Sequence, residues 1–133
     1  MQEQIGAKFS IKQWEEKPYL ELEDGVKMAQ AHVVTSYQGD LVGEGKLEYL
    51  MYYTAGGSYH FVGLEHFSGQ VGGRSGSFVL QHHGKDENGA VRGHYSVVPG
   101  SGTGELANLR GQGTYLLAGH ADQYDFPFEY SLD

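Results

Sequence analysis

Glycines divide the stretch from Gly72 to Gly113 into short runs in which apolar and polar residues alternate. Alternation with a period of two places every second side chain on the same face of a β-strand. The rhythm extends over most of the 133-residue chain, which has 21 glycines and 3 prolines, with 10 tyrosines and 6 phenylalanines. Aromatic residues favour strands, and glycine favours the tight turns that join them. The sequence therefore predicts an all-β protein.

Eight strands are predicted within one domain, because no segment has the composition of a domain boundary. They cover residues 5–14, 28–38, 41–54, 59–69, 74–84, 90–98, 112–118 and 123–132. Two segments interrupt the rhythm: a charged linker over Glu15–Lys27 and one short helical turn over Thr103–Arg110, whose Leu106 and Leu109 are expected to cap one end of the fold. An open sheet of eight strands leaves two exposed edges, whereas a barrel pairs them. We therefore predict a closed antiparallel eight-stranded barrel, with a two-sheet sandwich as the alternative.

Composition excludes several classes of protein. The net charge is −8 and the basic residues are scattered, so we expect no attraction to nucleic acid. No apolar run approaches the ~20 residues of a membrane helix. The first residues show no basic segment followed by an apolar core, so no secretory signal is expected. With no cysteine in the chain, a cytoplasmic location is the default expectation.

Turn residues predict how neighbouring strands pair, because a two-residue loop sets the register of its hairpin. Gly39-Asp40 suits a type II′ turn, whereas Gly56-Gly57 and Asn88-Gly89 suit type I′ turns. The looser segment Gln70–Gly73 closes the remaining hairpin. The resulting cross-strand neighbours are Ala31 with Glu48, Glu48 with Glu65, Tyr52 with Phe61, Glu65 with Phe78, and His82 with Tyr95.

These neighbours share one face, which we assign to the barrel interior. The face continues through Val33, Leu50, Gly63, Phe67, Gly76, Leu80, Val91, Gly93 and Val97. The opposite face carries an apolar patch, which predicts a contact between copies of the chain or a seat for the N-terminal linker. Its members are Leu47, Tyr49, Met51, Val62 and Leu64.

A pair of carboxylates is the sharpest chemical consequence of this register. Glu48 and Glu65 would lie side by side on an otherwise apolar face, with Lys46 two residues along the same strand. Burial and mutual repulsion raise the pKa of one member of such a pair, which suits acid–base catalysis unless the lysine neutralises the pair. Both glutamates are therefore candidate catalytic residues. A structural polar cluster and an anchor for a ligand are the alternatives.

An apolar interior of this size also predicts a binding site for a small molecule. The candidate ligand-binding residues are Lys46, Tyr52, Phe61, Phe78, His82 and Tyr95. His82 fits a hydrogen-bonded core residue better than a catalyst. The histidines show neither HxH nor HExxH spacing, so we predict no metal site, and no motif indicates an organic cofactor.

Four segments of the chain resemble a small bacterial family of unknown function, domain-of-unknown-function family 3224. They are GDLVGEGKLEYLMYY at residues 39–53, FVGLEHFSG at 61–69, GGRSGSFVLQHHG at 72–84 and VVPGSGTGELANLRGQG at 97–113. The resemblance implies a calycin-like barrel similar to those of allene oxide cyclases and dirigent proteins. Both of those groups act on small hydrophobic molecules, but their functional residues have no matching positions in this chain.

Three functions are consistent with these observations. The first is a barrel that binds a small apolar or amphipathic molecule, anchored by Glu48 or Glu65. The second is an isomerase or cyclase that uses the carboxylate pair and needs no cofactor. The third is a structural oligomer with a filled interior. No motif decides whether the protein is an enzyme.

Overall fold

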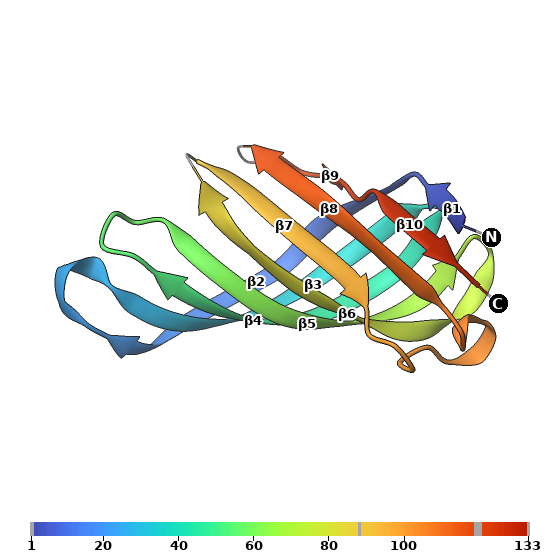
Figure 1. The fold of residues 1–133 in the computed structure, drawn as a ribbon, viewed down its shortest axis with the longest axis horizontal. Helices are drawn as coiled ribbons and strands as arrows, with labels where there is room; N and C mark the ends of the chain where they lie inside the picture. The colour runs from blue at the N-terminus through green and yellow to red at the C-terminus, as the bar shows by residue number, and fades with distance from the viewer. Residues whose placement is uncertain (1, 88, 119–120, 133) are drawn as a thin grey trace.

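A computed structural model describes residues 2–87, 89–118 and 121–132. Over these residues ten strands pair in one antiparallel sheet in the order β1-β10-β8-β7-β6-β5-β4-β3-β2-β9, which confirms the all-β prediction (Figure 1). No helix within these residues is long and apolar enough to cross a membrane. The strands are β1 (Gln2–Ile5), β2 (Ala7–Glu21), β3 (Lys27–Gly39), β4 (Leu41–Tyr53), β5 (Tyr59–Val71), β6 (Arg74–Glu87), β7 (Ala90–Val97), β8 (Arg110–Ala118), β9 (Tyr124–Asp125) and β10 (Phe128–Ser131), with short 3₁₀ turns η1 (Glu23–Gly25) and η2 (Gly104–Leu106).

The sheet curls into a half-barrel that is open, so the prediction of a closed barrel is wrong (Figure 1). At one end the C-terminal segment bridges the two flanks, because β10 pairs with β8 and β1 while β9 pairs with β2. Pro127, which lacks an N–H, separates the two short strands of this segment. Beyond the bridge, residues 10–21 of β2 pair only with β3 among the described residues, and residues 113–118 of β8 pair only with β7. The interior is thus covered at one end and accessible at the other.

The charged segment Glu15–Lys27 is part of a hairpin and not the predicted linker. Strand β2 runs through this segment to Glu21, which pairs with Lys27 at the start of β3. The backbone N–H of Leu22 donates to the carbonyl of Val26 at 2.8 Å and closes the turn. The side chains of residues 11–21 are all exposed, and polar residues are compatible with a strand that has water on both faces. The hairpin therefore projects beyond the core (Figure 1).

The turns on either side of β4 each differ from the two-residue loops that we expected. Asp40 alone separates β3 from β4, and its backbone and carboxylate hydrogen-bond to Gly6 and Gly72. In the next turn Thr54 donates its backbone N–H to the carbonyl of Ser58 at 2.8 Å, which leaves a three-residue loop. An odd number of loop residues moves the pairing by one position, and a shift of one exchanges the two faces of a strand.

The register of β4 is therefore reversed relative to the prediction, while β3 and β5 keep their predicted faces. Leu47 lies opposite Glu65, and Glu48 lies opposite His32 and Leu64. Between β5 and β6 the register is shifted by two residues, which preserves the faces but changes the neighbours. The predicted neighbours that the structure contradicts are Ala31 with Glu48, Glu48 with Glu65, Tyr52 with Phe61, and Glu65 with Phe78.

The hairpin of β6 and β7 has the predicted register, in which His82 faces Tyr95. Glu87 pairs with Ala90, as a two-residue turn requires, and Gly89 has the positive φ of 84° expected there. Asn88, the other residue of that turn, lies outside the described residues. Turn chemistry alone was sufficient to predict this pairing.

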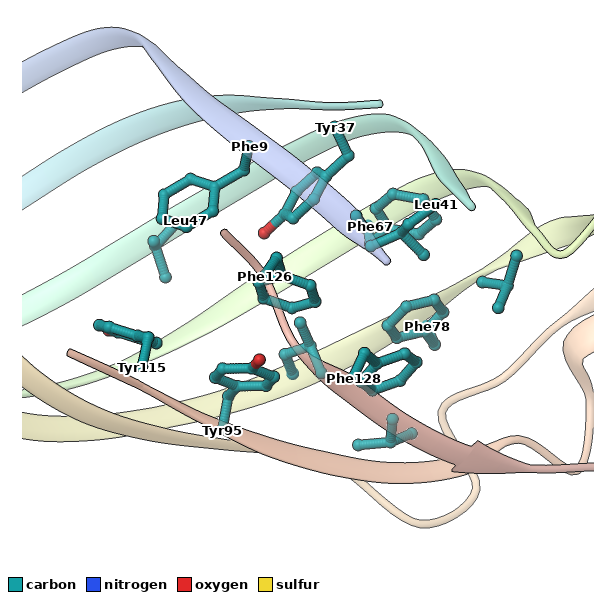
Figure 2. Close-up of a cluster of buried hydrophobic side chains, with 14 of the residues drawn as sticks. Phe9, Tyr37, Leu41, Leu47, Phe67, Phe78, Tyr95, Tyr115, Phe126 and Phe128 are labelled. Atoms are coloured by element: carbon teal, nitrogen blue, oxygen red, sulfur yellow. The ribbon is translucent and has the colours of Figure 1, made fainter. Parts of the chain in front are cut away.

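Aromatic side chains fill the bridged end of the half-barrel (Figure 2). The rings of Tyr95 and Phe126 stack with centroids 4.4 Å apart and an interplanar angle of 13°. Glycines on the strands make room for such rings: a Cβ at Gly93 would lie 2.3 Å from Cζ of Tyr115. The buried aromatic residues include Phe9, Tyr37, Phe67, Phe78, Tyr95, Tyr115, Phe126 and Phe128.

The predicted helical turn is present as η2 and covers this packed end. Leu106 and Leu109 are both buried, and the backbone N–H of Thr103 donates to the carbonyl of Ser77 in β6 at 2.9 Å. Gly76 of β6 lies directly beneath, because a Cβ there would lie 3.2 Å from Leu106. The turn thus closes the end of the half-barrel that lies opposite the accessible one.

Candidate functional site

A cavity of about 300 Å³ lies on the concave side of the sheet. Its wall is mostly aromatic and includes Phe9, Tyr37, Tyr49, Phe61, Tyr115 and Phe126. Ile11 and Trp14 of β2 also line it and are 42% exposed, so the cavity reaches solvent beside this strand. An apolar cavity with a few convergent polar groups is typical of small-molecule sites.

Glu65 of β5 is the carboxylate in this wall, and it has no exposed surface. One carboxylate oxygen, Oε2, accepts hydrogen bonds from the Thr35 hydroxyl at 2.6 Å and the Tyr37 hydroxyl at 2.7 Å. The other, Oε1, lies 2.8 Å from Nε2 of His82. Thr35 and Tyr37 reach the same oxygen because they are two residues apart on β3 and share its concave face.

Gly45 of β4 provides the space for this arrangement. It pairs with Thr35 on one side and with Phe67 on the other. A Cβ at Gly45 would lie 2.1 Å from Oε2 of Glu65 and 2.3 Å from Oγ1 of Thr35. Any other residue at this position would have to displace the carboxylate or the hydroxyl.

The surroundings of Glu65 favour its ionised form. Burial raises the pKa of the carboxyl, but the hydrogen bond and charge of His82, with the hydrogen bonds from Thr35 and Tyr37, together lower the pKa below 4.5. Burial and the nearby Glu65 raise the pKa of Tyr37 well above 10, so its hydroxyl keeps the proton that it donates. Burial raises the pKa of Tyr115, also in the wall, to about 12. At neutral pH the site holds a buried carboxylate among protonated phenols.

His82 connects Glu65 to the rest of the wall. Its ring is 4% exposed and packs against Tyr49 and Tyr95, with centroids 6.1 and 5.8 Å away. Nε2 faces Glu65, whereas Nδ1 is buried and has no hydrogen-bond partner among the described residues. An imidazole held at one nitrogen by a carboxylate leaves the other nitrogen for a ligand or a proton.

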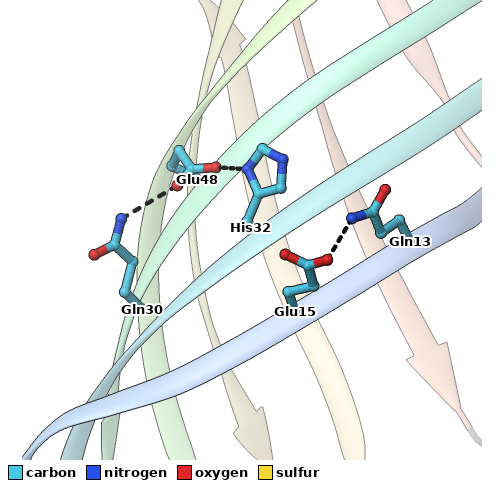
Figure 3. A network of polar contacts seen from close by, with 5 residues as sticks. All are labelled: Gln13, Glu15, Gln30, His32 and Glu48. Atoms are coloured by element: carbon cyan, nitrogen blue, oxygen red, sulfur yellow. Dashed lines mark hydrogen bonds and ion pairs between the residues drawn. The ribbon is translucent and has the colours of Figure 1, made fainter.

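Glu48 lies on the convex face, so the predicted pair of carboxylates is not formed. Its carboxylate contacts the His32 ring and accepts a hydrogen bond from Gln30, whose amide nitrogen is 3.2 Å away (Figure 3). The side chains of Glu48 and His32 are 50% and 46% exposed. The reversed faces of β4 are the physical reason for this placement, and they leave Glu65 as the acidic residue of the cavity.

The other predicted site residues divide between the cavity, the packed end and the surface. Phe61 and His82 line the cavity, and Tyr95 packs on His82. Phe78 is buried outside the cavity wall, at the packed end. Lys46 and Tyr52 are exposed on the convex face because they belong to β4.

Most residues of the cavity wall were absent from the predicted site, among them Thr35, Tyr37 and Tyr49. Thr35 and Tyr37 continue the alternation of Ala31 and Val33 on β3, so extending that pattern by four residues would have found them. Tyr49 lies on β4, and finding it required the correct register of that strand.

The residues of the predicted apolar contact face are divided between the interior and the surface. Leu47 and Met51 are buried and Tyr49 lines the cavity, whereas Val62 and Leu64 are 53% and 56% exposed. The predicted patch therefore does not form one surface. Among the described residues, no group of three or more metal-ligating side chains could hold a metal ion.

The fold and site define a class: a curled antiparallel sheet with a carboxylate and an imidazole buried together in the wall of an apolar cavity. A family model described as protein of unknown function (DUF3224) matches residues 5–130, and the chain belongs to this family. A crystal structure of a protein with unknown function from the DUF3224 family, from Shewanella oneidensis MR-1, is similar to this chain, with a TM-score of 0.81 and 31% sequence identity over 100% of this chain and 98% of that one. None of the curated proteins matches the chain. The likeness to allene oxide cyclases and dirigent proteins is not tested by these matches and stays a prediction.

Proposed function

We propose that the protein binds one small apolar or amphipathic molecule in the cavity beside Glu65 and His82. The observation that carries this proposal is an unfilled space of about 300 Å³ within a wall of aromatic side chains. Because the cavity reaches solvent, water contacts its apolar wall, and covering that wall with a ligand would be favourable. A space that a few larger side chains would fill is better explained by a ligand.

The polar groups of the wall support the same proposal. Burying a carboxylate and an imidazole stabilises a fold less than apolar residues of the same volume would. Glu65 and His82 nevertheless occupy the cavity wall. Polar groups at the edge of an apolar pocket orient a ligand and select among ligands.

Catalysis is the second candidate, and the contact between Glu65 and His82 is the observation that favours it. A carboxylate that fixes one imidazole nitrogen prepares the other for proton transfer. An isomerase or cyclase without a cofactor would then use this pair in place of two carboxylates. A filled structural interior is the least supported function because the cavity is open.

A fluorescence titration tests the binding proposal. N-phenyl-1-naphthylamine emits more strongly in apolar surroundings, and we expect saturable binding of one molecule per chain. Leu117→Trp fills the cavity from β8, whereas Leu116→Trp adds the same ring to the neighbouring exposed position, which is 59% exposed. We expect at least about tenfold weaker binding for Leu117→Trp and unchanged binding for Leu116→Trp, with circular dichroism checking each fold. Equal affinities in all three proteins, or no saturable binding to the folded protein, would contradict the proposal.

A further inference from the structure

We propose that the ligand carries a hydroxyl group that hydrogen-bonds to Nδ1 of His82. This inference rests on the proposed function and names the chemical class of the molecule. The first observation is that Nδ1 is the one buried side-chain nitrogen or oxygen without a hydrogen-bond partner among the described residues. Such an atom is costly to leave unpaired in an apolar interior. Because His82 lines the cavity, a polar atom of a ligand would supply the missing partner once the side chains that cover Nδ1 shift aside.

Glu65 is not the group that a ligand would contact first. Its two oxygens already accept from Thr35 and Tyr37 and interact with His82, at distances of 2.6 to 2.8 Å. A cationic ligand would have to displace one of these donors to reach the carboxylate. The carboxylate therefore acts by holding the His82 ring in place, and Nδ1 is the atom left for recognition.

The chemistry of imidazole selects the hydroxyl. With Nε2 directed at the carboxylate, a neutral ring offers Nδ1 as an acceptor and a protonated ring offers it as a donor. A hydroxyl both donates and accepts, so it pairs with Nδ1 in either state. An ammonium group only donates and an ether only accepts, so each pairs with one state alone.

The rest of the ligand should be apolar and compact. Aromatic and aliphatic side chains make up the remaining wall, including Phe61, Met51 and Val33. The phenol groups of Tyr49 and Tyr115 interact with each other in this wall. A volume of about 300 Å³ lies at the small end of the ~300–1,000 Å³ range of small-molecule pockets, which favours a compact ligand.

Two probes that share the same hydrocarbon skeleton test the inference. 1-Adamantanol and 1-methyladamantane differ only in having a hydroxyl or a methyl group on the same hydrocarbon. Their affinities are measured by displacement of N-phenyl-1-naphthylamine, and the result is the ratio of the two dissociation constants. The ratio is compared between proteins, because the free energy of hydrating each probe in water then cancels.

The variant that removes Nδ1 must not leave Glu65 with a missing donor. Glu65→Gln/His82→Leu replaces the charge and the ring together, and His83→Leu is the matched control because His83 is the exposed neighbour on the opposite face of β6. We expect the ratio in the wild type and in His83→Leu to favour the alcohol by about three- to tenfold more than in the double variant, which corresponds to one hydrogen bond. An equal ratio in all three proteins would overturn the inference.

A second measurement does not depend on a variant. In protein with ¹⁵N-labelled histidine, we expect the Nδ1 resonance of His82 to move on addition of 1-adamantanol and to stay in place with 1-methyladamantane. A Nδ1 resonance that responds equally to both probes would also overturn the inference. If both probes displace the dye but the affinity ratio and the Nδ1 resonance do not distinguish the alcohol from the hydrocarbon, only the hydroxyl assignment fails. If neither the dye nor the probes bind, the proposed function fails.

Discussion

Glu65 is an ionised side chain without exposed surface, and hydrogen bonds from protein groups replace its lost hydration. The sign of its pKa shift determines how stability depends on pH. Because the folded pKa lies below 4.5, Glu65 stabilises the protein above its unfolded pKa, and this contribution is lost as the pH falls through the folded pKa. The fold should therefore lose stability in acid partly through this one residue.

The corresponding prediction compares two glutamate variants. We expect Glu65→Gln to lower the free energy of unfolding at pH 7, and the difference from wild type to shrink as the pH falls below 4.5. Urea denaturation at a series of pH values measures this difference. Glu48→Gln, on the exposed convex face, is the control and should leave the pH dependence close to that of the wild type. A difference for Glu65→Gln that stays constant with pH would show that the carboxylate has no such role.

Gly45 provides a second prediction at the level of a single residue. We expect Gly45→Ala to destabilise the protein by about 1–3 kcal/mol, because the added methyl group would lie 2.1 Å from Oε2 of Glu65. Gly56→Ala is the control, since a Cβ at Gly56 has no heavy atom within 4 Å. Thermal unfolding followed by circular dichroism measures both. Equal stability of the two variants would contradict the described position of the carboxylate.

At the level of strands, β4 shows where prediction from sequence fails. The alternating residues of this strand predict that it exists, and its bounds were right to within one residue. They do not indicate which of its two faces points inward, because both contain apolar side chains. The answer depends on the turns, and Asp40 forms a one-residue connection through hydrogen bonds to Gly6 and Gly72, which are distant in the sequence.

The hairpin of β6 and β7 shows the opposite outcome. Its turn is short and local, so turn chemistry predicted the pairing of His82 with Tyr95. The prediction therefore placed His82 correctly opposite Tyr95. It also placed Glu65 on the correct face of β5. Their contact could not be predicted, because it also depends on the register between β5 and β6. A two-residue loop, Gly72-Gly73, sets that register in place of the expected four-residue loop Gln70–Gly73.

The register of β4 leads to a direct prediction. We expect Met51→Ala to destabilise the protein by about 2–5 kcal/mol and the neighbouring Leu50→Ala by less than about 0.5 kcal/mol, because Met51 is 4% exposed and Leu50 is 50% exposed. Urea denaturation of both variants measures the two free energies of unfolding. The reverse order of effects would restore the predicted register, in which Leu50 faces inward.

At the scale of the whole molecule, the half-barrel combines a packed end with an end that projects into solvent (Figure 1). The sequence predicted full closure because eight strands can pair both edges, but the C-terminal strands are too short to do so. β9 has two residues and β10 has four, so they bridge the flanks at one end only. The accessible interior results from that incomplete bridge.

The projecting part of β2 should be the least protected region of the sheet. Its residues 12–21 have one neighbouring strand among the described residues, and the pairing with β3 contains two irregularities. We expect backbone amides there to exchange with deuterium faster than those of β5, which pairs on both sides. Hydrogen exchange followed by mass spectrometry measures both strands. Protection of residues 12–21 equal to that of β5 would show that this edge is covered in solution.

The central claim is that a small molecule binds on the concave side of the sheet, beside Glu65 and His82. Nuclear Overhauser effects from a bound probe to labelled methyl groups test it most directly, because Met51 and Leu117 line the cavity while Leu50, Val62 and Leu64 lie on the convex face. With 1-adamantanol bound, the account predicts contacts to the methyl groups of Met51 and Leu117. Contacts to Leu50, Val62 and Leu64 in their place would contradict it.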